Sequence, residues 1–172
     1  MITGKKIARR MALIVLAGIA VGGIVGRTQA GPPQFKGLPV ALTLKTDKKT
    51  YAPTDPILIT FTAKNKTKSR MTLDFTSGQR YDFEIKTGKK GAEKTVWKWS
   101  QGMMFTMMMT ALPLAESKSV EFKQTYTPTT DPAKLKYNAQ KPLAPGTYTL
   151  VATLTTSDTE HRPHASVTFV VK

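Results

Sequence analysis

Apolar and polar residues alternate in short runs along most of the chain beyond residue 39. Neighbouring side chains of a β-strand point to opposite faces of its sheet, so a period of two predicts strands with one buried and one exposed face. No stretch beyond residue 30 shows a convincing 3.6-residue helical period. The pattern predicts strands over residues 40–45, 57–64, 71–76, 80–86, 97–99, 120–122, 147–154 and 166–171.

Turn-forming residues separate these runs. Pro53 and Pro56 precede the second run, Ser77-Gly78 separates the third from the fourth, and Pro145-Gly146 opens the seventh. About seven to eight short strands at this spacing predict an all-β fold, an immunoglobulin-like antiparallel β-sandwich, with a closed barrel as the architectural alternative. Residues 127–145 hold four of the eleven prolines and show no alternation, so we expect a long surface connection there.

The first 30 residues differ in character from the rest. Four basic residues precede a run of 15 uncharged residues (11–25), and a small-residue sequence ends at Ala30. This order is typical of a secretory signal peptide, and the apolar run is shorter than the roughly 20 residues that span a membrane. The sequence therefore predicts a signal peptide over residues 1–30, cleaved after Ala30, and one domain over residues 31–172. We expect that domain to be exported to the periplasm, the cell surface or the medium, with an uncleaved membrane anchor as the alternative.

Composition narrows the functions further. The chain has 172 residues and no cysteine, which excludes disulfides, thiolate metal sites and thiol catalysis. Its net charge is +15, and removing the five basic residues of the first 30 leaves +10. Such a charge favours anionic partners, such as cell-wall polymers, anionic lipids or acidic proteins. Because we expect export, we predict no nucleic-acid partner.

Only one pair of carboxylates suggests catalysis. Asp82 and Glu84 lie on one face of a predicted strand, about 7 Å apart at roughly 3.4 Å per residue. Arg80 and Lys86 flank them, so we expect a solvent-exposed face on which charges pair across strands. The sequence therefore predicts a protein that is not an enzyme and has no cofactor.

Five methionines crowd seven positions, Met103 to Met109. Thioethers are ligands for Cu(I), and His161 and His164 add imidazoles near the C-terminus. Methionine, however, commonly fills gaps in cores or covers adaptable binding surfaces, and this run contains no carboxylate or histidine. We therefore predict no metal site, with Cu(I) binding as a minor alternative. Asn65-Lys66-Thr67 matches a glycosylation tripeptide, without other support.

The aromatic residues lie in an ordered series of motifs. The first motif is the run from Thr72 to Phe83, the second is Val96-Trp97-Lys98-Trp99-Ser100, and Pro145-Gly146-Thr147-Tyr148 comes last. We expect Gly78 to adopt a positive φ in a tight turn, and Tyr81 and Phe83 to enter the core. At least one tryptophan should be buried, and Asp82 should face Lys98 or Arg80. The motif residues singled out are Phe75, Ser77, Gly78, Gln79, Tyr81, Asp82, Phe83, Trp97, Trp99, Ser100, Phe105, Gly146 and Tyr148.

Together these motifs resemble the BsuPI intracellular proteinase inhibitor domain over residues about 57–155. The resemblance implies an immunoglobulin-like sandwich, which agrees with the strand pattern, and a protein partner, in particular a serine protease of the subtilisin-like type. Most of the motif residues are expected to maintain the fold.

Two segments could contact such a partner. The connection 127–145 has Leu135, Lys136 and Tyr137 at its centre, a mixture of basic and large apolar side chains found at recognition sites. The segment 102–113 is the other. The alternative function is an adhesive domain of the cell envelope that binds anionic surface polymers through its positive charge.

Overall fold

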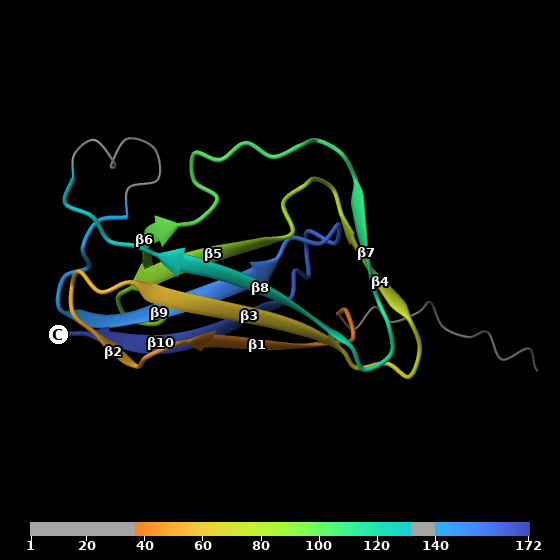
Figure 1. Ribbon diagram of the computed structural model, residues 1–172, viewed down its shortest axis with the longest axis horizontal. Coiled ribbons are helices and arrows are strands. Elements are labelled where there is room, and N and C mark those ends of the chain that lie inside the picture. The colour runs from red at the N-terminus through yellow and green to blue at the C-terminus, as the bar shows by residue number, and fades with distance from the viewer. Residues whose placement is uncertain (1–36, 132–139) are drawn as a thin grey trace, which may run out of the picture. The chain divides into compact units, whose positions relative to one another are not determined.

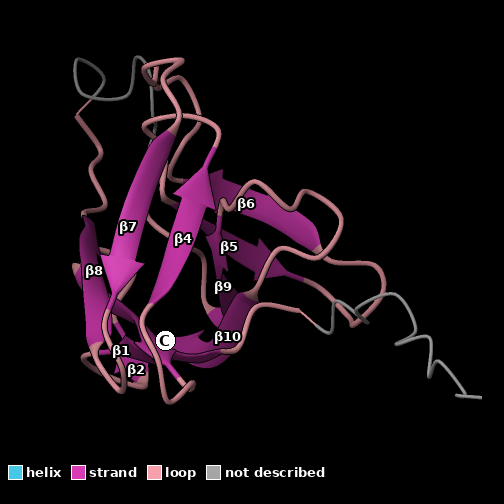
Figure 2. Ribbon diagram, turned by 90° about the vertical axis from the view of Figure 1, so that its right-hand side faces the viewer, coloured by secondary structure: helices cyan, strands magenta, loops and turns pink. Residues whose placement is uncertain are grey.

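The computed structural model describes residues 37–131 and 140–172, and within them every regular element is a β-strand (Figures 1 and 2). The strands, in chain order, are β1 (Val40–Thr46), β2 (Thr50–Tyr51), β3 (Ile57–Asn65), β4 (Met71–Phe75), β5 (Tyr81–Thr87), β6 (Lys94–Lys98), β7 (Thr110–Leu114), β8 (Ser119–Tyr126), β9 (Gly146–Leu154) and β10 (His164–Val171). No helix in these residues is long and apolar enough to cross a membrane.

The strands form two larger sheets and one ribbon. The three-stranded sheet has the order β1-β3-β8, and the five-stranded sheet has the order β2-β10-β9-β5-β6. All neighbouring strands are antiparallel except β2, which runs parallel to β10. The pair β4-β7 forms the separate ribbon, which Figure 1 shows beyond the ends of the two larger sheets.

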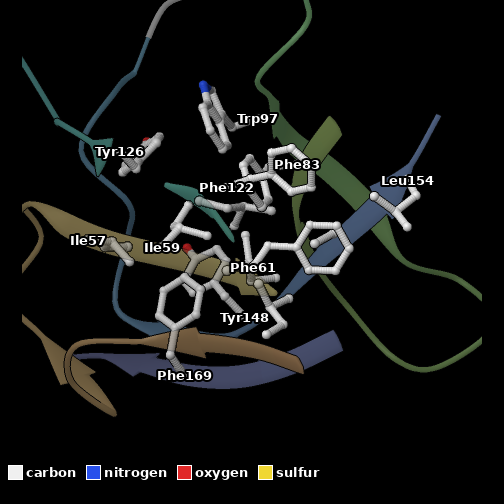
Figure 3. Close-up of a cluster of buried hydrophobic side chains, with 14 of the residues drawn as sticks. Ile57, Ile59, Phe61, Phe83, Trp97, Phe122, Tyr126, Tyr148, Leu154 and Phe169 are labelled. Carbon is white, nitrogen blue, oxygen red and sulfur yellow. The ribbon is translucent and has the colours of Figure 1, made fainter. Parts of the chain in front are cut away.

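The core lies between the two larger sheets. In β3 the residues at alternate positions, Ile57, Ile59, Phe61 and Ala63, are all buried, as a strand with one inward face requires. Phe61 packs edge-on against Phe83 of β5, with ring centroids 6.1 Å apart. Figure 3 shows these rings and their neighbours converging from both sheets. Burial of large apolar side chains is the main favourable term that holds the layers together.

Asn65 connects the ribbon to the three-stranded sheet. Its side chain is buried, and its amide Nδ2 donates to the carbonyl oxygens of Ser69, Leu114 and Ala115 at 2.8 to 3.0 Å. Its Oδ1 accepts from the backbone N and the hydroxyl of Thr67, both at 2.7 Å. The tripeptide that matches a glycosylation site is therefore a turn motif whose amide is fully engaged.

All eight predicted strand regions are strands, and the all-β class is confirmed. The region 97–99 is the least complete match, because β6 ends at Lys98. Two strands were missed. Strand β2 has only two residues inside a turn-rich stretch, and its Tyr51 is buried against Phe169. Strand β7 contains Pro113, which lowers its strand signal, and it pairs with β4 alone.

The expected boundary at Ala30 and the signal peptide over residues 1–30 lie outside the described residues. The domain boundary at residue 31 therefore stays a prediction.

We predict that Phe83→Ala lowers the free energy of unfolding by about 3–5 kcal/mol, because a fully buried ring leaves a cavity where both sheets meet. Urea unfolding followed by tryptophan fluorescence measures this change. Val96→Ala is the control, since Val96 lies on the neighbouring β6 but is 40% exposed, and it should change stability by less than about 0.5 kcal/mol. Equal stability of both variants and the unchanged protein would contradict the assigned core.

Candidate functional site

The carboxylate of Asp82 on β5 contacts the residues at and just after the end of β6. Asp82 is only 8% exposed, and its Oδ2 accepts a 2.6 Å hydrogen bond from the hydroxyl of Ser100. Its Oδ1 accepts from the backbone N of Ser100 at 3.2 Å and of Phe83 at 2.9 Å. Lys98 Nζ lies 3.3 Å from Oδ2, as expected for the pairing of Asp82 with Lys98. The carboxylate therefore holds the chain where it leaves the edge strand β6.

The expectation that this face is open to solvent is wrong at Asp82. The backbone turn at Ser100 folds over the carboxylate, and Lys98, which is paired with Glu84 in the strand register, also contacts it. Sequence alternation places a residue on a face but does not reveal whether a later loop covers that face.

Glu84 and Lys98 form the adjacent ion pair, with Oε1 and Nζ 2.9 Å apart, and Lys86 contacts the other oxygen of Glu84. Burial alone would raise the pKa of Glu84, but hydrogen bonds from Lys98 and Lys86 outweigh it and hold that pKa below its ordinary value. The hydrogen bond to Glu84 raises the pKa of Lys98. These charges neutralise one another, which is typical of a structural ion-pair group.

An aromatic stack extends from this point. Trp99 stacks on Tyr81 with ring centroids 4.6 Å apart, and Phe105 packs on Trp99 at 5.8 Å. Tyr81 also packs on Phe122 and accepts a hydrogen bond from Gln124 Nε2. Tyr81 and Trp99 are half-buried rather than fully inside, while Phe83 and Trp97 are buried. Phe105 thus attaches the segment after β6 to the side of the domain.

Gly78 supplies a second attachment, and for a different reason from the one predicted. Its backbone is not in the positive-φ region that favours glycine. Instead, a Cβ at this position would lie 2.5 Å from Thr106 Oγ1, a distance that forces something to shift. The backbone N of Gly78 donates to the carbonyl of Thr106 at 2.9 Å, and the hydroxyl of Thr110 donates to the carbonyl of Ser77. Glycine is required here for close approach of two loops.

The other motif residues have internal roles. Gln79 Nε2 donates to the carbonyl of Tyr81, and Gln79 N donates to Ser77 Oγ across the turn. Phe75 is fully buried in β4. Tyr148, which follows Gly146, is buried against Phe169 and donates from its hydroxyl to the carbonyl of Ala144.

Residues 103–109, here called the methionine loop, present five methionine side chains to solvent on either side of the attached residues Phe105 and Thr106. Figure 1 shows the long connection from β6 to β7 that contains this loop. The exposed fractions are 41% for Met103, 98% for Met104, 93% for Met107, 66% for Met108 and 75% for Met109. Contiguous exposed apolar side chains on a soluble domain commonly mark an interaction surface.

The methionine loop lies within a long stretch of uncharged residues. Residues 99–115 contain no charged side chain, although 22% of the whole chain is charged. The sequence makes the segment 102–113 one of two contact candidates, and its methionines suit either core filling or an adaptable binding surface. A segment without charge fits both roles, so the exposure of the methionines follows only from their place in the fold.

The other predicted contact segment is only partly described. Its two ends run side by side, since Thr129 N donates to the carbonyl of Gln140 at 2.8 Å and the hydroxyl of Tyr126 donates to the carbonyl of Lys141. Burial raises the pKa of Tyr126 to about 12. Leu135, Lys136 and Tyr137 lie outside the described residues.

Within residues 37–131 and 140–172, no three His, Cys, Asp or Glu side chains are grouped so that they could hold a metal ion. Asp82 Oδ2 accepts a hydrogen bond from the Ser100 hydroxyl and also contacts Lys98 Nζ, so both residues are held by one carboxylate. The arrangement is suited to holding a loop in place.

Fold and site together define an all-β domain that displays an anchored apolar loop. The chain belongs to the BsuPI family, described as intracellular proteinase inhibitor, whose family model matches residues 44–159. No curated protein matches the chain.

Several solved structures are similar to the chain at low sequence identity. The sporulation control protein Spo0M of Bacillus subtilis matches at 12% identity with a TM-score of 0.47, over 77% of this chain and 49% of that one. The alkylpurine DNA glycosylase AlkC of Pseudomonas fluorescens matches at 14% identity and 0.45, over 79% and 31%. The CARDB domain of a Pyrococcus furiosus protein matches at 10% identity and 0.38, over 77% and 94%. The chain thus spans about half or less of the first two structures.

The family description corrects the expected location. BsuPI proteins are described as intracellular, which contradicts the prediction that this chain is exported. The prediction rested on the composition of the first 30 residues, and a basic stretch before a short apolar run does not by itself establish that an export receptor reads it. The adhesive function at the cell envelope, which presupposed export, loses its basis.

We predict that Gly78→Ala lowers the free energy of unfolding by about 1–3 kcal/mol, because the new methyl group overlaps Thr106 Oγ1. The β-branched Thr106 has few rotamers with which to move aside. Thermal unfolding measures the loss.

The double variant Gly78→Ala, Thr106→Ala is the decisive comparison, because the next nearest atoms to the added methyl group are 3.6 Å away or more. Part of the loss should be recovered in it. Gly37→Ala, with nothing within 4 Å of the added Cβ, is the control and should be neutral. Absence of any coupling between positions 78 and 106 would contradict the contact.

We also predict that the methionine loop does not bind Cu(I) tightly, because its neutral thioethers are exposed and residues 103–109 contain no histidine or carboxylate. Competition with a chromophoric Cu(I) chelator measures the affinity, with all five methionines replaced by leucine as the comparison. A submicromolar site that disappears in the leucine variant would overturn this prediction.

Proposed function

We propose that this protein inhibits a protease by placing the methionine loop in the cleft of the enzyme. The supporting observation is that Met104 and Met107 are almost completely exposed, on a loop that is anchored before it at Ser100 and within it at Thr106. Membership of a family described as proteinase inhibitors supports a protease as the partner. The contact needed is large, since interfaces between proteases and inhibitors bury about 1,600 Å².

Anchoring favours this use of the loop. Asp82 holds Ser100 before the loop, and Gly78 holds Thr106 within it. A segment that is already ordered loses less conformational entropy when it binds, so more of the contact energy appears as affinity. Phe105, packed on Trp99, turns inward and leaves the methionines on either side of it exposed.

The composition of the loop indicates the kind of protease. A protease with an acidic specificity pocket would gain little from residues 99–115, which contain no lysine or arginine. An apolar pocket accepts an unbranched methionine side chain. We therefore propose a serine protease of the subtilisin-like type, with Met104 or Met107 in its specificity pocket.

The connection 127–145 is the second candidate segment. Thr129 and Gln140 close its base through a backbone hydrogen bond, which supports presentation of the residues between them. Leu135, Lys136 and Tyr137 stay the proposed contacts on that segment.

We further infer that the two facing sheets constitute an immunoglobulin-like β-sandwich. The antiparallel pairing of all neighbouring strands except β2 and β10, and the shared core between the sheets, support this architecture.

We predict that Met104→Ser, Met107→Ser weakens inhibition of subtilisin at least about tenfold, because two exposed apolar contacts are lost while the anchors stay. Cleavage of a chromogenic peptide at increasing inhibitor concentrations gives the inhibition constant, and the melting temperature should be unchanged. The matched comparison is Leu135→Ser, Tyr137→Ser on the other segment.

The two variants separate the candidate segments. If only the change at positions 135 and 137 abolishes inhibition, the contact lies on the connection 127–145 and the methionine loop is not the inhibitory segment. If the unchanged protein leaves subtilisin fully active and is itself digested, the proposed target class is wrong.

A further inference from the structure

Met104 and Met107 of the methionine loop are the most exposed methionines among the described residues. The chain has no cysteine, so no thiol of its own competes for an oxidant. Met104 and Met107 are more than nine-tenths exposed, and Met109 and Met108 follow at 75% and 66%. Oxidation of methionine depends on access of the oxidant to sulfur, so this gradient predicts an order of reaction.

Met71 provides an internal reference. It lies on β4, is partly buried and packs against the core. The side chain of Met71 is therefore shielded on one side, whereas the side chains of Met104 and Met107 are open to solvent. Because these residues lie in one molecule, they meet the same oxidant concentration, and a difference in their oxidation rates reflects their accessibility.

The fold does not depend on the sulfur atoms of the loop. Its attachments are the Ser100 hydroxyl on Asp82, the Phe105 ring on Trp99 and the Thr106 carbonyl on Gly78. An oxygen added to an exposed sulfur is hydrated at once and buries no new polar group. Oxidation therefore changes the surface of the loop and leaves its position unchanged.

From these observations we propose that the methionine loop is an oxidation-controlled surface, in which peroxides convert apolar thioethers into polar sulfoxides and so release the partner. The release rests on the proposed inhibitory function, while the modification of the surface does not.

The reaction balances without any group from the protein other than the thioether. The sulfur lone pair attacks one oxygen of hydrogen peroxide, the O–O bond breaks, an S–O bond forms, and the second oxygen leaves as water after proton transfer. Sulfur loses two electrons and the peroxide gains two. A methionine sulfoxide reductase reverses the change with a dithiol, which becomes a disulfide and releases water.

The first experiment maps oxidation in the intact protein. Limited treatment with hydrogen peroxide, followed by proteolysis and mass spectrometry of the peptides, gives the fraction of sulfoxide at each position. We expect Met104 and Met107 to react at least about tenfold faster than Met71. Oxidation of Met71 at the same rate as these two residues, with the protein still folded, would overturn the proposal.

The second experiment measures the surface and the partner together. Retention on a phenyl resin reports the apolar surface, and inhibition of subtilisin reports the partner contact. The control replaces all five loop methionines by leucine, which is apolar, similar in volume and inert to peroxide. Oxidised protein should elute earlier and inhibit at least about tenfold more weakly, and reductase treatment should restore both properties. The leucine variant should respond in neither assay.

The outcomes distinguish the two proposals. If the untreated protein does not inhibit subtilisin but its retention falls on oxidation and the leucine variant is unaffected, the controlled surface stands and the inhibitory function fails. If the leucine variant loses retention or inhibition to the same extent as the unchanged protein, the effect arises elsewhere and the oxidation-controlled surface is wrong. Inhibition that persists at full loop oxidation also overturns the proposed release.

Discussion

The position of the proposed contact surface depends on one carboxylate. Asp82 is nearly buried on β5, and four donors from Phe83, Ser100 and Lys98 satisfy its two oxygens. A buried charge without such partners would cost several kcal/mol, so the chain after β6 is strongly held at Ser100. The contact of Phe105 with Trp99 and the approach of Thr106 to Gly78 both lie just after Ser100 in the chain, so they depend on the position in which Asp82 holds it.

In the methionine loop, different residues provide the order of the segment and its apolar contact surface. Phe105 and Thr106 face the domain and provide order, while the methionines on both sides of them face solvent and provide apolar surface. Order lowers the entropic cost of binding, and the flexible thioether side chains still adapt to a partner. The proposed inhibitory role and the proposed sensitivity to oxidation both arise from this division.

The motif residues gather at one place in the fold. The run from Phe75 to Phe83 and the run from Trp97 to Ser100 are distant in sequence, yet they meet at β5, β6 and the loop that follows. Their contacts are with one another, which is the pattern of residues that maintain a fold. The side chains available to a partner are instead the methionines between the motifs, so the family signature and the proposed contact are separate features.

Eight of the ten strands in the described residues could be predicted from the sequence, because alternation of apolar and polar residues follows directly from the two faces of a pleated strand. The sequence also predicted the burial of Phe83 and of at least one tryptophan, which is Trp97, and it offered Lys98 and Arg80 as partners of Asp82, of which Lys98 is the one in contact. It did not reveal β2, whose two residues are too few for a period, or β7, which contains a proline.

The contacts of the folded chain were needed to show that Asp82 is covered, that Gly78 is needed for a close approach rather than for its φ, and that the methionines are exposed. Each of these depends on a contact between segments that local pattern does not encode: Ser100 lies 18 residues from Asp82, and Thr106 meets Gly78 across two strands and their connections.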